Sequence, residues 1–390
     1  MSLGASLGLS IGGGVAAKMK LLALVSDAFG GEGGIAQYNR DLLRALTAHE
    51  DGAHILVIPR HGRAIAQELP RGVRQLAPGR KCRFLLTALW AALVEGGPFD
   101  AVFCGHLHLA PLAAIIAGLL RCPLWLQVHG TEAWGRLSRA QQWAAERAIL
   151  VTAVSRYTRR RFLALSRIDP ARVRVLPNTV GAEFIPGPKP HSLLKRHGLL
   201  SKRILLTVGR LAAAERGKGH DRVLQVLPEL LKTDPNLVYL VVGDGDDRER
   251  LRALAQKAGV EDKVVFAGHV RPDELADYYR LADVFIMPST QEGFGIAFVE
   301  AAASGLSVIG GDRDGSVDAL GEGAIGRMID PLDDARLLEA IRAALAQPGP
   351  DPTLVRRFRF ENFAEHVCGL VFTHLLPGPG MAIGGAAAIW

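Results

Sequence analysis

Short apolar runs alternate with amphipathic segments along most of the chain. In the first half, β-rich runs recur from residues 20–26 to 173–176, and helical patterns such as 35–46 lie between them. A second series of the same kind begins at 204–208 and continues to 307–309. Strands that alternate with helices predict a mainly parallel sheet in each half, so we expect an α/β protein with two domains.

Two stretches rich in proline interrupt this pattern. Residues 182–198 carry three prolines and are typical of a linker, and a second break at 348–352 precedes a final helical pattern. Two Rossmann-like, doubly wound domains that face each other across a cleft are the expected architecture. The expected organisation is a disordered extension at 1–18, an N-terminal domain at 19–185, a C-terminal domain at 186–355, a final helix at 356–376 and an irregular tail at 377–390.

The composition is that of a soluble globular protein, with 49% hydrophobic and 22% charged residues among 390. No apolar run is long enough to cross a bilayer. Residues 1–17 lack the basic start of a secretory signal, and Met19 is an alternative first residue. The four cysteines have neither metal-ligand spacing nor a disulfide pattern. We therefore expect a cytoplasmic protein with reduced thiols.

The net charge of +7 is distributed unevenly. Residues 1–185 hold 22 Lys and Arg against 12 Asp and Glu, a net of +10, whereas the remainder holds 24 against 27, a net of −3. A basic half predicts an anionic partner. Nucleic acid is not expected, because no helix-turn-helix, RNP or zinc pattern is present. An anionic membrane surface or a phosphorylated acceptor fits better.

Two segments of the basic half bear on membrane contact. Residues 80–94 (RKCRFLLTALWAALV) have a basic start and an apolar body. A buried helix with a solvated start is the favoured interpretation, and a helix that lies on a membrane surface is the alternative. Residues 156–161 hold four arginines, which form either a solvated helix face or part of a cationic surface. Peripheral contact with the cytoplasmic membrane face is therefore a hypothesis.

The strongest candidate for chemistry is the stretch 287–303 (MPSTQEGFGIAFVEAAA), where a buried strand ends, a loop follows and a helix begins. Gly293 and Gly295 allow backbone N–H groups to approach a ligand, and a helix N-terminus favours an anion. Glu292 and Glu300 flank this anion site and can accept hydrogen bonds from hydroxyls. A surface loop beside a helix that one Glu stabilises is the alternative.

A second candidate follows the first strand of the C-terminal half. Arg210 comes directly after that strand, and Lys218 stands just before the next helix, with Arg216 between them. Two cations at the carboxyl end of a strand can neutralise a diphosphate. The alternative is a charged surface loop, but the second anion site at 293–296 favours the functional interpretation.

Three further patterns are weaker. The glycines of residues 30–34 permit close backbone approach at a helix start, but they do not form GxGxxG and the next strand ends without an acidic residue, which disfavours a dinucleotide site. His129 follows a strand, where a structural role is commoner, and its place beside Gly130 makes a ligand contact plausible. The acidic run at 244–247 opens a helix, so we expect no metal there.

These motifs occur together in one known order: GG-x-A from Gly33, HG from His129, PN from Pro177, GRL…KG at 209–219 and EGFGIAFVE at 292–300. The chain resembles the retaining GT-B glycosyltransferases of family 4, also called glycosyl transferases group 1, over roughly residues 20 to 370. Its long loop between Arg210 and Lys218 is similar to that of bacterial polysaccharide and lipopolysaccharide assembly enzymes. In that longer form Arg216 is the alternative cation.

The resemblance implies that a nucleotide-diphosphate sugar binds mainly to the C-terminal domain. Glu300 would bind the ribose, and Glu292 would bind the sugar. Arg210 and Lys218 would neutralise the diphosphate. Backbone N–H groups of Phe294, Gly295 and Ile296 would assist, together with Gly34. Gly33 and Gly293 are also expected to bind the donor.

The resemblance also implies the rest of the reaction. His129 would contact the sugar near the reacting carbon, and Val270 would lie beside the base. The acceptor, a glycan or a lipid-linked molecule, would bind the N-terminal domain, to which the final helix would cross back. Neither a metal nor another cofactor is implied.

Donor and acceptor are left open by these motifs. GDP-mannose is the favoured donor, and a UDP-sugar of glucose, galactose or N-acetylglucosamine is the alternative. A sugar-nucleotide-binding module without catalysis is a second hypothesis. An NAD(P)-dependent oxidoreductase is a third, which the missing dinucleotide fingerprint disfavours.

Overall fold

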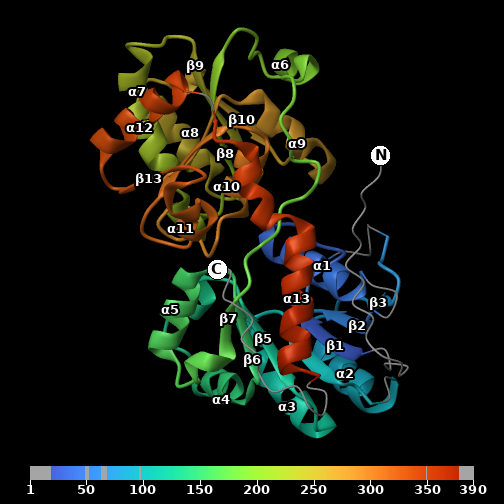
Figure 1. Ribbon diagram of the computed structural model, residues 1–390. Coiled ribbons are helices and arrows are strands. Elements are labelled where there is room, and N and C mark those ends of the chain that lie inside the picture. The colour runs from blue at the N-terminus through green and yellow to red at the C-terminus, as the bar shows by residue number, and fades with distance from the viewer. Residues whose placement is uncertain (1–18, 49–51, 63–67, 96–97, 348, 377–390) are drawn as a thin grey trace, which may run out of the picture.

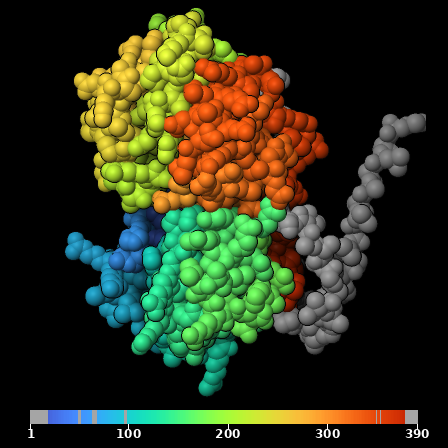
Figure 2. Space-filling model, turned by 90° about the vertical axis from the view of Figure 1, so that its left-hand side faces the viewer, coloured from blue at the N-terminus to red at the C-terminus, as the bar shows by residue number. Residues whose placement is uncertain are grey.

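The computed structural model describes residues 19–48, 52–62, 68–95, 98–347 and 349–376. The extension expected at 1–18 and the tail expected at 377–390 lie outside these ranges. Two lobes, each built on a parallel sheet with helices around it, are stacked one above the other (Figure 1). The space-filling view shows that the two lobes are in contact along a boundary that crosses the molecule (Figure 2).

The N-terminal lobe contains a seven-stranded sheet in the order β3-β2-β1-β4-β5-β6-β7, with all neighbours parallel. Its central strands are buried along almost their whole length, as apolar runs between two helix layers should be. The strands are β1 (Lys20–Val25), β2 (His54–Pro59), β3 (Val73–Gln75), β4 (Ala101–Cys104), β5 (Leu124–Val128), β6 (Leu150–Ala153) and β7 (Val173–Val175).

The C-terminal lobe contains a six-stranded parallel sheet in the order β10-β9-β8-β11-β12-β13. Both sheets therefore have the doubly wound topology that the alternating pattern predicted. The strands are β8 (Arg203–Val208), β9 (Leu237–Val242), β10 (Val264–Gly268), β11 (Val284–Met287), β12 (Ser307–Gly311) and β13 (Arg327–Ile329).

Helices cover both faces of each sheet (Figure 1). In the N-terminal lobe they are α1 (Gly34–Thr47), α2 (Lys81–Trp90), α3 (Ala110–Leu120), α4 (Arg139–Arg147) and α5 (Arg156–Leu165). In the C-terminal lobe they are α6 (His191–Arg196), α7 (His220–Leu231), α8 (Arg248–Lys257), α9 (Pro272–Leu281), α10 (Ile296–Ala303), α11 (Ser316–Ala319) and α12 (Asp334–Ala346). The 3-10 segment η8 (Pro352–Phe358) and the helix α13 (Phe360–His374) follow.

The strand order places the ligand edge of each sheet. In the N-terminal sheet the winding direction reverses between β1 and β4, and in the C-terminal sheet it reverses between β8 and β11. Loops that leave the carboxyl ends of such strands diverge and open a crevice, where ligands of α/β proteins bind. The loop after β11 and the cations after β8 therefore belong to one such crevice.

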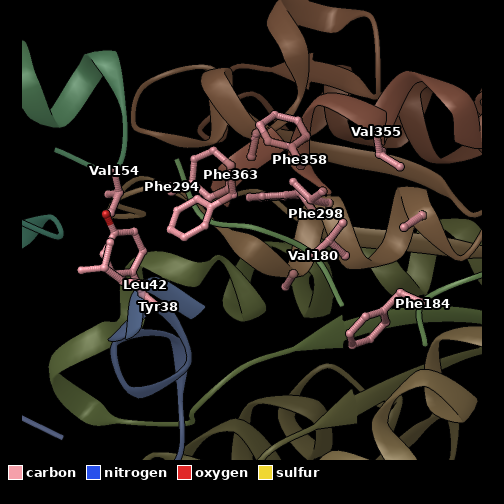
Figure 3. Close-up of a cluster of buried hydrophobic side chains, with 14 of the residues drawn as sticks. Tyr38, Leu42, Val154, Val180, Phe184, Phe294, Phe298, Val355, Phe358 and Phe363 are labelled. Carbon is pink, nitrogen blue, oxygen red and sulfur yellow. The ribbon is translucent and has the colours of Figure 1, made fainter. Parts of the chain in front are cut away.

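The last helix returns to the N-terminal lobe. Helix α13 runs along α1 (Figure 1), and the ring of Phe363 packs edge-on against Tyr38 at 5.9 Å. The backbone N–H of Val180 donates to the carbonyl of Phe358 (2.8 Å), so the two segments that pass between the lobes lie side by side. Figure 3 shows the buried cluster that results, in which Phe294 packs against Phe358 at 5.5 Å.

The sequence pattern did not predict two of the strands. Strands β3 and β13 are three residues long, and each forms one edge of its sheet. Such short segments have too few positions to show an alternation, and their pairing is decided by the neighbouring strand.

The expectation that residues 80–94 form a buried helix with a solvated start is correct for the start and wrong for about half of the apolar body. Helix α2 buries Phe84 and Ala88, whereas Leu86 is 66% exposed and Leu93, in the turn that follows α2, is 64% exposed. The physical reason is geometric. One stripe of a helix can face the sheet, and this segment carries apolar side chains on nearly every side.

Two arginines of 156–161 stabilise the fold through hydrogen bonds to backbone carbonyls. Arg159 donates to the carbonyls of Val173 (2.8 Å) and Pro170 (3.0 Å), and Arg161 donates to the carbonyl of Trp134 (3.2 Å). These hydrogen bonds hold α5 against the segments before and after it.

Candidate nucleotide-sugar site

The loop of residues 288–295 connects β11 to α10 at the crevice of the C-terminal lobe. Gly295 ends the loop in the left-handed region (φ 87°), where a glycine is favoured, and a Cβ there would approach the ring of Phe298 to 2.5 Å. Helix α10 therefore starts sharply at Ile296. The N–H groups that open a helix have no acceptor inside it, so those of residues 294–296 can bind an anion.

An ion pair joins this loop to the cations that follow β8. Lys218 Nζ lies 2.5 Å from Glu292 Oε1, and both side chains are only 16% exposed. Burial works against the charge of Lys218, but the neighbouring Glu292 carboxylate outweighs it and raises the pKa of Lys218. The stem of Lys218 passes over Gly209, where a Cβ would lie 3.1 Å from its Cδ. The amine is thus a fixed positive charge beside the loop.

The other two cations have different surroundings. Arg210 is 73% exposed and pairs with Glu215, so its guanidinium is accessible at the crevice. Arg216 binds Asp247 at the start of α8, with its Nε 3.0 Å from Oδ1. Because Arg216 is held at α8 while Lys218 contacts Glu292, the structure favours Lys218 as the cation of the loop.

The rest of the C-terminal lobe holds the loop in place. Asp314 accepts a hydrogen bond from the backbone N–H of Glu292 (2.7 Å), and the N–H of Gly315 donates to the Glu292 carbonyl (2.8 Å). A Cβ on Gly315 would meet the Gly293 carbonyl at 2.0 Å. The side chain of Phe294 points into the interlobe cluster (Figure 3), so the backbone of this residue, not its ring, belongs to the site.

Glu300 lies one turn into α10 beside a buried tyrosine. The hydroxyl of Tyr279 donates to Glu300 Oε2 at 2.6 Å. Burial raises the pKa of Glu300 to about 7, although the hydrogen bond from Tyr279 opposes this shift. A ligand that brings further hydroxyl donors would compensate the cost of keeping this carboxylate ionised.

His129 lies at the end of β5, on the N-terminal side of the lobe boundary and opposite the loop of residues 288–295. Its ring is buried against Tyr38 (5.1 Å between centroids), and Nε2 lies 3.0 Å from the Gly105 carbonyl. Since a carbonyl can only accept, Nε2 carries the proton, and burial lowers the pKa of His129. The neutral ring therefore leaves Nδ1 as the nitrogen that a ligand could meet. The His129 carbonyl also presses on Gly293, where a Cβ would approach it to 1.9 Å.

The glycine turn of the N-terminal lobe faces the same region. Gly33 caps α1 in the left-handed region (φ 91°), and a Cβ at Gly33 or Gly34 would meet no atom within 4 Å. Across the lobes, Glu32 Oε2 lies 3.6 Å from Nε2 of His269, the neighbour of half-buried Val270. The turn is thus open on its own side and close to the residues after β10.

The structure brings most of the expected residues to one interlobe region, but the sequence did not indicate what holds them. Asp314 and Gly315, which fix the loop, and Glu215, which pairs with Arg210, were missed. Their contacts link separate segments or follow local turns, and neither leaves a periodic signal. Within the described ranges, no three or more His, Cys, Asp or Glu side chains are grouped to hold a metal ion.

The raised pKa of Glu300 predicts a pH-dependent stability. Between pH 4.5 and 7 the folded protein keeps a proton that the unfolded chain releases, so the stability contributed by protonated Glu300 is present below pH 4.5 and is lost as the pH rises through about 7. Glu300→Gln should remove this loss. Its melting temperature should exceed that of the wild type at pH 8 and match it near pH 4.5, as measured by circular dichroism.

The exposed Glu339, on α12, provides the control, and Glu339→Gln should melt like the wild type at both pH values. A difference between Glu300→Gln and the wild type that stays constant with pH would contradict the assignment.

Two family models match the chain. That of glycosyl transferases group 1 matches residues 194–361, and that of glycosyltransferase family 4 matches residues 32–184. Among solved structures, Anabaena HepE in complex with UDP-glucose has a TM-score of 0.74 at 19% identity over 91% of this chain and all of that one. WaaG, a glycosyltransferase involved in lipopolysaccharide biosynthesis, has a TM-score of 0.62 at 22% identity over 90% and 95%.

Curated relatives agree with these matches. GDP-mannose-dependent alpha-(1-6)-phosphatidylinositol monomannoside mannosyltransferase of Mycolicibacterium smegmatis is 31% identical over 242 residues, which are 59% of this chain and 63% of that protein. D-inositol 3-phosphate glycosyltransferase of Acidothermus cellulolyticus is 35% identical over 229 residues, or 54% and 50%. The matches thus span 50–63% of these relatives' own length. The fold and the family matches together place the chain in glycosyltransferase family 4, with the GT-B fold.

Proposed function

We propose that this chain is a retaining glycosyltransferase that moves a hexose from a nucleotide-diphosphate sugar to a lipid-linked or cell-envelope glycan. One observation carries the proposal. The Lys218–Glu292 ion pair brings a partly buried cation and a carboxylate together beside the N-terminus of α10. These are the groups that a sugar diphosphate requires.

The binding roles follow from these positions. The diphosphate lies between Arg210, Lys218 and the N–H groups of residues 294–296. Its oxygens accept hydrogen bonds from these N–H groups. The ribose hydroxyls bind Glu300, one turn farther along α10. Glu292 binds the sugar hydroxyls while its other contact stays with Lys218, so the carboxylate remains oriented. His129 meets the sugar through Nδ1.

The mechanism depends on charge that develops on the leaving diphosphate as the glycosidic bond breaks. Fixed cations and N–H groups stabilise that charge more in the transition state than in the bound substrate, by several kcal/mol for such a constellation. Attack by the acceptor on the face that the diphosphate leaves would retain the configuration, with the departing phosphate taking the proton. Lys218 and Arg210 supply the positive charge, so the proposal involves no metal.

GDP-mannose is the favoured donor. The relative of Mycolicibacterium smegmatis is named as GDP-mannose-dependent, and another so named, from Mycobacterium tuberculosis, is 34% identical over 251 residues. A UDP-sugar remains the alternative, since HepE was solved with UDP-glucose. In either case the base would lie near Val270, after β10.

The transfer assay is direct. The purified protein is incubated with GDP-mannose, UDP-glucose, UDP-galactose and UDP-N-acetylglucosamine in the presence of a metal chelator, and release of nucleoside diphosphate is measured with and without membrane lipid extract. We expect release from one donor and a larger release with the extract. Lys218→Met should lower the rate by about a hundredfold or more, the scale for a preorganised charge stabiliser.

Lys232→Met is the matched control, because Lys232 is 70% exposed and lies at the far end of α7. Folded wild-type protein that releases nothing from any donor would contradict the proposed activity. Tight nucleotide binding without release would instead favour the binding module without catalysis.

We further propose that a membrane surface is the partner of the basic lobe. Helix α2 and the turn after it lie on the N-terminal lobe, away from the C-terminal lobe (Figure 1). Exposed apolar side chains next to exposed cations suit the boundary between anionic headgroups and acyl chains. We call these residues the α2 surface: Arg80, Lys81, Arg83, Leu85, Leu86, Trp90, Leu93 and Val94. None of the described helices combines the length and apolarity that a membrane crossing requires.

Vesicle flotation tests the α2 surface. The protein should float with vesicles of phosphatidylcholine and phosphatidylglycerol, less with phosphatidylcholine alone, and less at high salt, which screens the headgroup charge. The double substitution of Leu86 and Leu93 by Ser should abolish flotation, because both side chains are exposed and their loss leaves the fold intact.

Leu332→Ser, at an exposed leucine of the other lobe, should float like the wild type. Equal flotation of the α2 variant and this control would exclude the α2 surface as the site of contact.

A further inference from the structure

The N-terminus of α5 in one lobe is held by a carboxylate from the other. Asp318, on α11, accepts hydrogen bonds from the backbone N–H of Arg156 (2.9 Å) and of Tyr157 (3.4 Å). It also accepts from Nε of Arg156, whose guanidinium reaches Glu322 as well. Burial works against the charge of Arg156, but its hydrogen bond with Asp318 outweighs this and raises the pKa of Arg156.

The first turn of α5 also binds the loop of residues 288–295. The hydroxyls of Ser155 and Thr158 both donate to the Gly293 carbonyl, at 2.6 Å and 3.2 Å. Each hydroxyl is fixed by a second contact, since Ser155 Oγ accepts from the Thr158 N–H (3.0 Å) and Thr158 Oγ1 accepts from Trp134 Nε1 (3.3 Å). Both side chains are fully buried.

These contacts form a closed circuit, in which α5, the loop of residues 288–295 and the segment 314–318 each contact the other two. Asp318 lies in the helix that follows Asp314 and Gly315, the two residues that bind the backbone of Glu292. Helix α5 therefore contacts the loop directly at Gly293 and indirectly through α11. A carboxylate at a helix N-terminus and a hydroxyl cap are each stabilising by themselves, so the circuit exists without a ligand.

Neither contact is needed to hold the lobes together as one chain. The polypeptide already crosses between them at Val180 and Phe358, and α13 packs on α1. The bonds of Asp318, Ser155 and Thr158 all lie across the lobe boundary, so relative opening of the lobes would break them. Closing the lobes would restore them and fix the Gly293 carbonyl.

We propose that Ser155, Thr158 and Asp318 are positioning residues that lock the loop of residues 288–295 when the lobes close. We call these three residues the α5 clasp. The inference rests on the proposed function, because the loop supplies the N–H groups for the leaving diphosphate. Orienting the Gly293–Phe294 peptide through its carbonyl orients the N–H of Phe294 on the opposite side of the same planar unit.

The clasp stabilises the closed arrangement of the lobes and does not itself bind the nucleotide. The side chains proposed to hold the nucleotide, those of Lys218, Arg210 and Glu300, belong to the C-terminal lobe and do not bond to the clasp. Of the backbone donors proposed for the diphosphate, only the N–H of Phe294 adjoins the clasp. A weakened clasp should therefore lower kcat while the Kd of the nucleoside diphosphate changes little. A merely structural residue would instead lower the melting temperature and both constants together.

Small-angle X-ray scattering of the ligand-free protein tests the clasp without any activity. Asp318→Asn keeps the size of the side chain but removes the charge that binds three donors, so the radius of gyration should increase. Asp312→Asn is the matched control, since exposed Asp312 lies in the same loop region and contacts only its neighbour Arg313 (3.9 Å) among the ion pairs of the described residues. Identical radii for wild type and Asp318→Asn would overturn the proposal.

Kinetics with the active donor give the second test. Thr158→Val keeps the shape and loses the hydroxyl, whereas Thr158→Ser keeps the hydroxyl. We expect a fall in kcat of about tenfold to a hundredfold for Thr158→Val, the scale for small misplacements of reacting groups, and a rate near wild type for Thr158→Ser. Equal rates for the two variants would overturn the positioning role.

The two tests separate this inference from the proposed function. If Asp318→Asn opens the protein but the wild type shows no transfer or donor hydrolysis, the clasp stands as an interlobe contact and the enzymatic proposal fails. If transfer occurs and neither the radius nor kcat responds to these variants, the clasp fails and the enzymatic proposal stands.

Discussion

The ion pair between Lys218 and Glu292 joins the two strand ends that border the crevice of the C-terminal sheet. Such a partly buried pair adds little net stability, because desolvation of both charges offsets their attraction. Its value is positional. Lys218 keeps its charge, and Glu292 is fixed by its contact with Lys218, before any ligand arrives. In the proposed function, a sugar diphosphate would find a cation for its phosphates and an acceptor for its hydroxyls at set places, which would lower the reorganisation required during the reaction.

The loop that carries Glu292 is fixed by both lobes. Asp314 and Gly315 bind the backbone of Glu292 from within the C-terminal lobe, and Ser155 and Thr158 bind Gly293 from the N-terminal lobe. Phe294 extends into the apolar cluster between the lobes (Figure 3). One loop therefore contacts the proposed donor site, the lobe boundary and the core, so movement of the lobes would affect the proposed chemistry at the crevice.

Sequence patterns predicted the parts of this arrangement that depend on local rules. Strand alternation predicted both sheets, and the glycines at a helix start, flanked by Glu292 and Glu300, predicted an anion site there. Other parts depend on packing between residues that are far apart in the sequence, and such packing leaves no local pattern. Asp318 is an ordinary surface carboxylate in the sequence, the edge strands β3 and β13 are too short for a period, and the face of α2 that meets the sheet is decided by β2. The arginines of α5 resembled a cationic surface because their carbonyl partners are distant in sequence.

The central claim is that the diphosphate lies at Lys218 and the ribose at Glu300. Calorimetric titration with the nucleoside monophosphate and diphosphate of the active donor separates the two positions. Lys218→Met should weaken binding of the diphosphate by about tenfold to a hundredfold, the scale of a lost charge-assisted hydrogen bond. It should weaken binding of the monophosphate less. Glu300→Ala should weaken the binding of both nucleotides by the same factor. An equal effect of Lys218→Met on the two nucleotides, or unchanged binding by Glu300→Ala, would contradict the account.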